Sequence, residues 1–514
     1  EGPDGLVRFF GITDIVRKRY EGQAFDTDAF RATEGTLPVD VSYAAHVQVT
    51  RIDPEVFVPP HPGDTASVAR GETLSHALSF DQMEHKLPIG LARSGEPLYA
   101  NLEFLNGDRG AHVSISGVSG VATKTTYATF LLYALFHSSV LGTDATNAKA
   151  IIFNVKGEDL LWLDKPNTRL NELAREEYQR LGLPAGPFGS VAVYAPAKRP
   201  TSPSSPPMPD TGSRHEGVSP YLWTLREFAR DRLLKFAFAD ADDARSQIAF
   251  LITRVERELE QAAQLGADDD PGITVDNRRL QSFDDLVDLL EGPTLDGMAP
   301  NAASGTLDAF RRRLSAAAFH IGHLIRGDAS ARGFGISWDE QQVTVVDIHR
   351  LHSLAQMFVV GVLLKRIMQV KELQGTSRPL VFVVLDELNK YAPRDGWSPI
   401  RDVLLDIAER GRSLGVSLLG AQQTASEVAR RIVANAAIKI VGRLDSAEAE
   451  RGEYGFLTKV SRLRAALLQP GSMIVAQPEI PTSLLLHFPF PAWATRESEV
   501  AKDDSRDPFA RKAR

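Results

Sequence analysis

Residues 111–155 contain two short apolar strands joined by a glycine turn and an apolar helix. The first strand is AHVSISG (111–117), the helix is YATFLLYALFHSSVL (127–141), and the second strand is KAIIFNV (149–155). Consecutive strands that are joined through a helix pair in parallel, and parallel sheets are covered by helices on both faces. This unit therefore predicts an α/β fold built on a parallel sheet.

Further strands rich in Val, Ile and Leu follow later in the chain. They are QQVTVVDI (341–348), RPLVFVVLDE (378–387), GVSLLGAQ (415–422) and AIKIVGRL (437–444). GSMIVAQP and SLLLHFPF, within 471–490, are expected to form a final pair. Short, nearly continuous apolar runs are typical of strands that are buried on both faces of a sheet.

The sequence pattern divides the chain into four parts. Residues 1–104 alternate short β-rich runs with Gly and Pro, which predicts a small N-terminal β-barrel. Residues 105–200 and 336–490 carry the parallel-sheet pattern. Between them, 201–335 hold a proline-rich loop and amphipathic helices, which predict a helical-bundle insertion. Residues 491–514 are expected to form a charged C-terminal tail without a core pattern.

The composition limits the kinds of site that this chain can build. The 514 residues include no cysteine, which excludes disulfides and thiolate metal sites. The formal net charge is −8, so a surface that binds nucleic acid has to be a local basic patch on an acidic body. Candidates for such a patch are the arginine runs 311–313 and 430–431, although a charge run on a helix is more often a solvated face.

No targeting or membrane segment is expected. The first residues, EGPDGLVRFFG, lack the basic stretch and apolar core of a signal peptide. The most apolar run, 127–141, is shorter than the roughly 20 residues of a membrane span, and His137 interrupts it. We therefore expect a cytoplasmic protein without a membrane span.

The turn GVSGVATKTT (117–126) has much of the chemistry of a phosphate-binding loop. In such a loop, backbone N–H groups wrap phosphate oxygens, a lysine reaches the β- and γ-phosphates, and the next hydroxyl binds Mg²⁺. Thr123, however, stands where the usual glycine adjoins the lysine. The expected nucleotide-binding residues are Gly117, Gly120, Val121, Ala122, Thr123, Lys124, Thr125 and Thr126. The alternative is a tight turn whose glycines only allow positive φ.

The apolar strand over 380–385 ends in two adjacent carboxylates, Asp386 and Glu387. In a nucleotide site, Asp386 would hold Mg²⁺ together with Thr125, and Glu387 would act as the general base toward the attacking water. The alternative is a carboxylate that caps the helix after the strand.

A third group of candidate residues lies within 406–428. Gln422 ends a strand, where it can sense the γ-phosphate. Arg410 or Arg412 can reach the phosphates of a neighbouring subunit and stabilise the transition state in trans. The alternative is that both arginines complement the dipole at the end of their helix. Because the three groups all follow strands, in chain order, we expect them to meet at one edge of the sheet and bind ATP.

These motifs together resemble the HerA/FtsK branch of the P-loop ATPases, and HerA proteins in particular. The residues that carry the resemblance are SISGVSGVATKT (114–125), FNVKGEDL (153–160), VVLDELNKYAP (383–393), LGAQQTASEV (419–428) and IVGRLDSAEAE (440–450). The resemblance covers the sheet pattern from residue 110 to about 490, apart from the insertion. It implies a RecA-like ATPase core, with the small barrel before it and the helical insertion within it.

The resemblance implies a homo-hexameric ring that uses ATP and Mg²⁺ to translocate double-stranded DNA through its channel, as a helicase-type motor. It implies that a NurA-like nuclease or another effector docks on the barrel face, in DNA end processing, repair or defence against phage. By motif, Lys124 and Thr125 are the phosphate and Mg²⁺ residues, and Asn154 replaces a customary aspartate.

Two other functions stay open at this point. The variant turn favours a ring that binds nucleotide and assembles an effector with little hydrolysis of its own, whereas the intact Asp386–Glu387 pair argues against it. A conjugation or secretion motor of the same superfamily is the third possibility. A chain without a membrane span argues against a motor that anchors itself.

Overall fold

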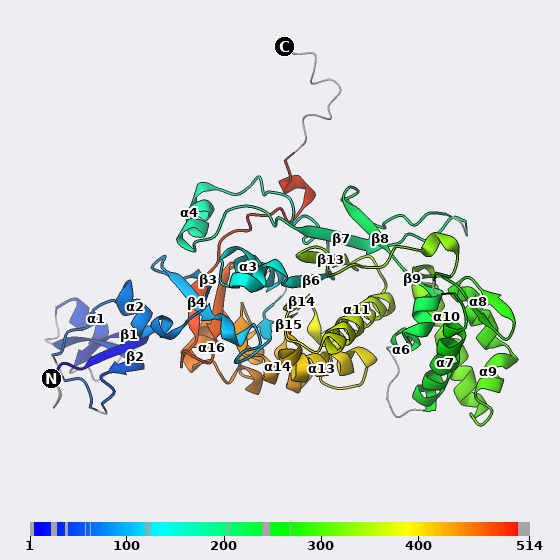
Figure 1. Ribbon diagram of the computed structural model, residues 1–514. Coiled ribbons are helices and arrows are strands. Elements are labelled where there is room, and N and C mark those ends of the chain that lie inside the picture. The colour runs from blue at the N-terminus through cyan, green and yellow to red at the C-terminus, as the bar shows by residue number, and fades with distance from the viewer. Residues whose placement is uncertain are drawn as a thin grey trace, which may run out of the picture.

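The computed structural model describes residues 5–21, 28–35, 40–56, 58–61, 63–118, 120, 124–202, 205–238, 247–267 and 269–501. A 12-stranded sheet with the order β4-β3-β18-β17-β16-β5-β15-β14-β6-β13-β7-β8 forms its centre (Figure 1). Strands β16 to β8 in this order run parallel, and β17, β18, β3 and β4 continue the sheet antiparallel. The predicted α/β fold is confirmed.

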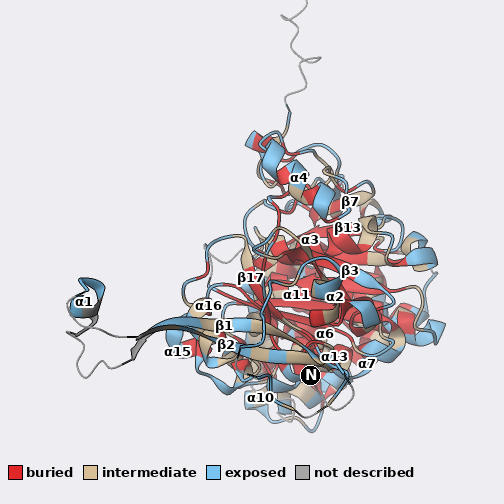
Figure 2. Cartoon of the chain, turned by 90° about the vertical axis from the view of Figure 1, so that its left-hand side faces the viewer, coloured by how far each residue is buried: buried red, intermediate tan, exposed pale blue. Residues whose placement is uncertain are grey.

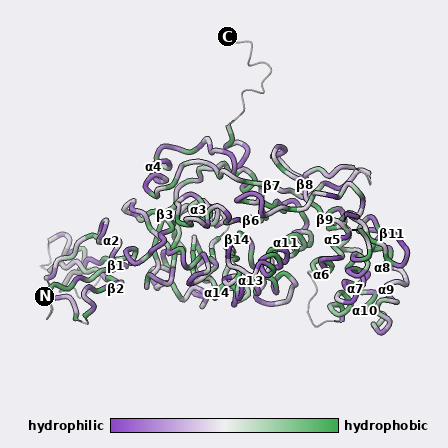
Figure 3. Tube along the Cα trace, viewed as in Figure 1, coloured by the Kyte–Doolittle hydropathy of each residue, from purple (hydrophilic) through white to green (hydrophobic). Residues whose placement is uncertain are grey.

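Six of the eight parallel strands coincide with apolar runs that were predicted as strands. They are β5 (Val113–Ser116), β6 (Lys149–Asn154), β13 (Val343–Asp347), β14 (Val381–Leu385), β15 (Val416–Gln422) and β16 (Ile438–Val441). The other two, β7 (Val191–Pro196) and β8 (Val218–Tyr221), were not predicted. The antiparallel strands are β17 (Ser472–Ala476), β18 (Leu484–His487), β3 (Lys86–Leu91) and β4 (Pro97–Asn101). Every residue of β14 is buried and apolar, so the strand is drawn in green in Figure 3. The expected final pair is β17 and β18.

Helices cover both faces of this sheet, as its apolar strands require. Helix α3 (Lys124–His137) packs with Phe382 and Val384 of β14 in one buried cluster. Helices α11 (Ser353–Gln374) and α13 (Pro399–Leu414) pack with Val381 and Val383 in the other. Successive residues of β14 therefore serve opposite cores, which Figure 2 shows as a buried interior on both sides of the sheet.

The described part of 1–104 differs from the predicted barrel. Strands β1 (Arg8–Glu21) and β2 (Asp40–Asp53) form a separate two-stranded antiparallel ribbon, which extends from the body in Figure 2. Strands β3 and β4 instead join the central sheet through β18. The barrel is therefore not confirmed: local strand patterns were recognised, but which sheet each strand joins depends on its partners. Two short helices lie in the same region, α1 (Asp28–Thr33) and α2 (Glu72–Ala77).

The helical insertion is present, but it begins later than the sequence indicates. Within the predicted range 201–335, β8 pairs with β7 and so belongs to the central sheet. The helices then follow as α5 (Leu225–Arg230), α6 (Leu234–Ala237), α7 (Gln247–Gln264), α8 (Phe283–Glu291), α9 (Pro293–Met298) and α10 (Ser304–Ile321). They are accompanied by the short strands β9 (Trp223–Thr224), β10 (Ile273–Val275), β11 (Arg278–Leu280) and β12 (Ile325–Arg326). Figure 1 shows α7 to α10 grouped at one end of the molecule.

The beginning of the predicted charged tail is part of the core. Trp493 is 1% exposed, and its ring lies 5.1 Å from that of Tyr133 in α3. Glu499 is 0% exposed and accepts a hydrogen bond from Asn167 and from Thr495. The expectation of a tail from residue 491 is therefore wrong for 491–501, because one aromatic anchor and one satisfied carboxylate hold this segment. Residues 502–514 lie outside the described residues.

Helix α11 is long and apolar enough to cross a membrane by length and composition alone. It packs instead against α13 and α10 within the described fold, and residues such as Phe358 and Leu364 are completely buried. A core helix that is surrounded by protein has the same composition as a membrane helix. The remaining helices are α4 (Glu172–Arg180), α12 (Leu388–Tyr391), α14 (Arg430–Asn435), α15 (Ser446–Ala449) and α16 (Lys459–Ala465).

Candidate nucleotide site

Four neighbouring parallel strands end at the same edge of the sheet, and each carries candidate residues. Their order is β5, β15, β14 and β6. The turn to Lys124 follows β5, Gln422 ends β15, the pair Asp386 and Glu387 follows β14, and Lys156 follows β6. The carboxyl edge of a parallel sheet is where such folds bind ligands.

The turn after β5 is fixed at its start to the neighbouring strands. The backbone N–H of Gly117 donates to the carbonyl of Gln422 at 3.1 Å, and that of Val118 donates to Arg443 at 2.7 Å. Gly120 has φ +83°, a conformation that favours glycine. Of the expected nucleotide-binding residues, Val121, Ala122 and Thr123 lie outside the described residues.

Lys124 begins helix α3 and is 5% exposed. Its ammonium donates to the carbonyl of Gly117 at 2.9 Å, which places its charge over the turn. Burial lowers the pKa of Lys124, and the nearby carboxylates of Asp386 and Glu387 oppose that shift. An ammonium at the first turn of a helix places two sources of positive potential together, because the helix N-terminus carries a partial positive charge.

Thr125 and Asp386 are in direct contact across the sheet edge. The Thr125 hydroxyl donates to Oδ2 of Asp386 at 2.9 Å, and the backbone N–H of Glu387 donates to Oδ1 at 2.8 Å. Asp386 is 9% exposed. A hydroxyl and a carboxylate side by side match the oxygen ligands that Mg²⁺ takes, with substrate phosphates and water as its other ligands. Thr126 is partly exposed on the next position of the helix.

Glu387 is held in an unusual backbone conformation next to a lysine. It precedes α12 with φ 55° and ψ 42°, in the left-handed region. Its Oε1 lies 2.5 Å from Nζ of Lys156, and the Glu387 side chain is 23% exposed. A residue without a glycine's freedom adopts this conformation at a cost of about 1 kcal/mol, so surrounding contacts have to hold it.

Gln422 is completely buried between β15 and β5. Its Nε2 donates to the hydroxyls of Ser114 at 2.8 Å and Ser116 at 2.9 Å, while Oε1 has no hydrogen-bond partner among the described residues. The glutamine thus connects the end of β15 to the strand that leads into the glycine turn. It occupies the expected position, but its amide points along the sheet edge toward these two serines.

The donor set fits a magnesium nucleotide. Lys124 and the N-terminus of α3 provide positive potential for phosphates, and Thr125 with Asp386 provides oxygen ligands for Mg²⁺. Within the described ranges no group of three or more His, Asp or Glu residues is placed to hold a metal. Mg²⁺ binds one or two protein carboxylates together with phosphate oxygens, and Thr125 with Asp386 provides that kind of donor set.

Arg410 and Arg412 lie apart from these residues. They are near the end of α13, which leads into the first residue of β15, whereas Gln422 is the last residue of that strand. Seven residues of strand separate the two edges by about 20 Å. Arg410 pairs with Asp406 and Glu372. Within one chain the structure therefore does not bring the arginines to the nucleotide site, and their action in trans stays a prediction.

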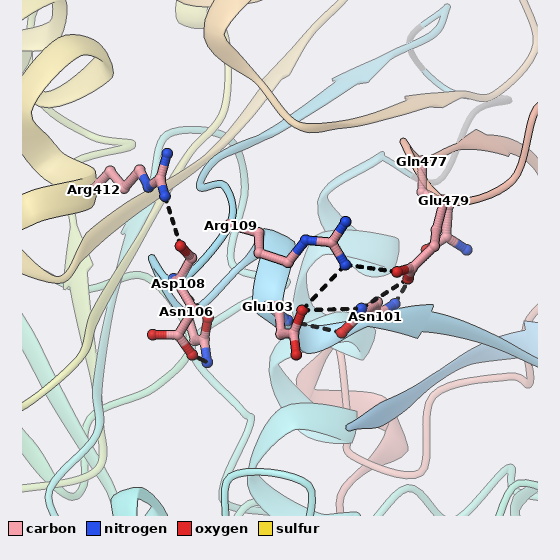
Figure 4. A network of polar contacts seen from close by, with 8 residues as sticks. All are labelled: Asn101, Glu103, Asn106, Asp108, Arg109, Arg412, Gln477 and Glu479. Carbon is pink, nitrogen blue, oxygen red and sulfur yellow. Dashed lines mark hydrogen bonds and ion pairs between the residues drawn. The ribbon is translucent and has the colours of Figure 1, made fainter. Parts of the chain in front are cut away.

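Arg412 belongs to a polar network at the amino edge of the sheet (Figure 4). It donates to the carbonyl oxygens of Gly107 at 3.0 Å and Asp108 at 2.6 Å. In the same network Arg109 pairs with Glu479 at 2.7 Å and with Glu103 at 3.3 Å. These contacts fix the loop that leads into β5, which is a structural role in addition to the one predicted.

Lys156 contacts a candidate catalytic residue, and the sequence analysis did not predict this contact. The motif KGE follows β6, but the adjacency of β6 and β14 brings Lys156 to Glu387. The nearby Asn154, at the customary aspartate position, donates to Oδ1 of Asp347 at 2.8 Å and so joins β6 to β13. Strand order was the missing information, because these residues are far apart in the sequence.

Solved structures with a similar fold exist, whereas no protein-family model and no curated protein sequence matches the chain. The bacterial conjugative coupling protein TrwB, in a form with sulphate, has a TM-score of 0.51 at 12% identity over 83% of this chain and 95% of that one. TrwB with ADP and Mg²⁺ has a TM-score of 0.50 at 11% identity, over 83% and 95%. VirB4 of Thermoanaerobacter pseudethanolicus has a TM-score of 0.48 at 17% identity, over 79% and 96%. The likeness to TrwB, at these identities, shows the fold alone, that of a RecA-like α/β core.

Proposed function

We propose that this protein is a P-loop ATPase that hydrolyses ATP with Mg²⁺ and uses the energy to move along double-stranded DNA. The observation that carries the proposal is the contact of Thr125 with Asp386, beside Lys124 and Glu387. Lys124 would hold the β- and γ-phosphates, Thr125 and Asp386 the Mg²⁺, and Glu387 would accept the proton of the attacking water. Mg²⁺ supplies neutralisation of the phosphate charge that develops in the reaction.

The HerA-like motifs and the fold shared with TrwB, a coupling protein solved with ADP and Mg²⁺, support the assignment to a motor. The proposal includes a homo-hexameric ring in which Arg412, or Arg410 in its place, serves the site of the neighbouring subunit. It includes a NurA-like nuclease or other effector docked on the N-terminal region, where the resemblance implies a barrel, in DNA repair or defence against phage. The ring, the arginine in trans and the effector rest on the resemblance in motifs. The proposal also includes a cytoplasmic location.

The test measures ATP hydrolysis by the full chain with and without duplex DNA, together with its molar mass in solution. Glu387→Gln removes the proposed base and is expected to lower kcat by about 10²- to 10⁴-fold, whereas Lys124→Ala should weaken nucleotide binding. Glu340→Gln, an exposed substitution of the same chemistry, is the control. Unchanged turnover in Glu387→Gln would contradict the catalytic assignment, and a monomer under all conditions would contradict the ring.

The binding-only scaffold is the second candidate. The Thr123 departure from the phosphate-loop pattern favours it, because a side chain stands where a glycine usually lets the backbone approach a phosphate. A wild-type ring that binds ATP without turnover would support the scaffold over the motor.

A further inference from the structure

We infer that one exposed surface of the helical insertion binds a DNA strand that has unpaired bases. We call this surface the α10 strip and define it by Arg199, Arg312, Arg313, Phe319, His320 and His352. The inference deepens the proposed function, because it rests on DNA as the substrate and names the residues that contact it.

The strip contains an array of flat side chains contributed by three separate segments. The guanidinium of Arg199 lies over the Phe319 ring at 5.0 Å from its centroid, and it also donates to the Phe319 carbonyl. The Phe319 and His320 rings meet edge to face at 5.1 Å. His320 in turn stacks on His352, with centroids 3.6 Å apart and planes 10° apart.

The array is open to solvent. The Phe319 side chain is 66% exposed, and both Arg199 and His352 are exposed. Phe319 belongs to none of the three hydrophobic clusters of the described residues. Its ring therefore does not serve the core. A ring in this setting offers a face on which a base can stack, whatever the identity of that base.

Two further arginines extend the strip along α10. Arg312 precedes Phe319 by seven residues, which places both on one face of the helix about 10 Å apart. Among the described residues, neither Arg312 nor Arg313 forms an ion pair, whereas Arg311 pairs with Asp296 and Asp308. The arginines 311–313, which the sequence analysis named as candidate DNA contacts, therefore differ in their charge environment. The charge of Arg311 is neutralised by its carboxylate partners, whereas Arg312 and Arg313 can bind an anion.

The charge of the strip contrasts with that of the whole chain. The net charge is −8, yet the residues that define the strip are cationic or aromatic. Asp308 lies one turn from Arg312 in α10 and pairs with Arg311 at 3.6 Å. The nearby Asp210 pairs with Arg350 at 3.4 Å. Cations beside stacked rings match the alternation of phosphates and bases in a single strand, whereas a duplex without unpaired bases offers no base face to Phe319.

The strip also lies at the edge of the sheet that holds the nucleotide site. Arg199 follows the carboxyl end of β7, and His352 follows that of β13. Strand β13 is two positions from β14 in the sheet, and β7 is three, so the ends of these two strands lie about 10 to 15 Å from the end of β14. DNA bound at Arg199 and His352 would therefore lie at the same edge of the sheet as the nucleotide site.

The experiment measures binding of the full chain to fluorescent DNA by anisotropy, using a blunt duplex and the same duplex with a single-stranded overhang. The variants are Phe319→Ala and the double variant Arg312→Ala/Arg313→Ala. Their matched controls on α7 are Phe250→Ala, whose ring is 71% exposed, and Arg254→Ala/Arg257→Ala, which removes two exposed arginines.

Phe319→Ala is expected to weaken binding of the overhang DNA by roughly five- to 100-fold and to leave blunt-duplex binding unchanged. The double arginine variant should weaken binding and reduce the slope of log affinity against log salt by about 1.4. Basal ATP hydrolysis should stay unchanged in both. If the wild type binds the overhang DNA and both variants bind it with the same affinity and the same salt dependence, the inference about the α10 strip is wrong. The proposed function would remain intact in that case.

Two other results would also decide the matter. If the wild type hydrolyses ATP but binds neither the blunt duplex nor the overhang duplex, DNA is not its substrate. The DNA part of the proposed function and the inference about the α10 strip would then both be wrong. Polyglutamate is added as a competitor of the fluorescent overhang DNA. If it displaces the DNA as well as unlabelled overhang DNA does, and if its binding is weakened by Arg312→Ala/Arg313→Ala but not by Phe319→Ala, the strip binds acidic polypeptides and the inference is overturned.

Discussion

Nζ of Lys156 lies 2.5 Å from Oε1 of Glu387, so the residue after β6 holds the carboxylate after β14. The contact joins two strands that are neighbours in the sheet, with more than 200 positions between them in the sequence. The ion pair restrains the Glu387 carboxylate to one orientation. It is also one of the contacts that hold Glu387 in its left-handed backbone conformation.

Replacing Lys156 is expected to lower turnover rather than nucleotide binding. Lys156→Met removes the ammonium that orients Glu387 and should lower kcat for ATP by about tenfold, with KM nearly unchanged because Lys124 is intact. Lys156→Arg keeps the charge and should recover part of the rate, and Lys459→Met, at an exposed position, is the control. A basal rate above wild type in Lys156→Met would show instead that the ion pair restrains the base.

Removing the hydroxyl of Thr125 should change the dependence on Mg²⁺. Thr125 contacts Asp386 at 2.9 Å, so the two oxygens form the expected metal position. Thr125→Ala is expected to raise the Mg²⁺ concentration for half-maximal ATP hydrolysis, and Thr125→Ser, which keeps the hydroxyl, should restore it. Thr253→Ala, which removes an exposed hydroxyl from helix α7, serves as control. An equal effect of both alanine variants would contradict the assignment of Thr125.

The buried amide of Gln422 should contribute to stability. Gln422→Leu keeps the volume of the side chain but leaves the hydroxyls of Ser114 and Ser116 without its two donors. We expect the free energy of unfolding to fall by about 1 to 3 kcal/mol, measured by urea denaturation. Gln423→Leu, at the exposed next position, should change it by about 0.5 kcal/mol or less. Equal stability of the two variants would contradict a structural role of the amide.

His112 should make the fold sensitive to acid. Its Nδ1 accepts the N–H of Leu418 at 3.0 Å, and burial lowers its pKa to about 4. Since a histidine in the unfolded chain has a pKa of about 6.5, the unfolded state binds a proton between these values that the folded state does not bind. The free energy of unfolding should therefore fall by about 1.4 kcal/mol for each pH unit from roughly 6.5 toward 4.

The variant His112→Asn tests this contribution, because asparagine tolerates the φ of 68° at this position. Urea denaturation at pH 7 and pH 4.5 should give a smaller loss of stability in the variant than in the wild type. His46→Asn, whose wild-type side chain is 71% exposed, should keep the full loss. An unchanged pH dependence in His112→Asn would show that another group carries the proton uptake.

The sequence by itself determined six of the eight parallel strands, the final pair β17 and β18, and the candidate residues that follow these parallel strands. Each strand is a short apolar run, and burial of such a run on both faces is a local property that composition reveals. Lys124, Thr125, Asp386, Glu387 and Gln422 stand next to these runs, so the direction of a parallel sheet was enough to expect them at one edge.

Only the tertiary structure decided which strands are neighbours. The order β5-β15-β14-β6 brings Lys156 to Glu387 and Gln422 to Ser114, and it leaves Arg410 and Arg412 at the opposite edge. The same choice of partners assigned β3 and β4 to the central sheet instead of a barrel. Which strands pair depends on side-chain contacts between segments that are distant in the sequence. The local pattern of a strand does not specify its partner.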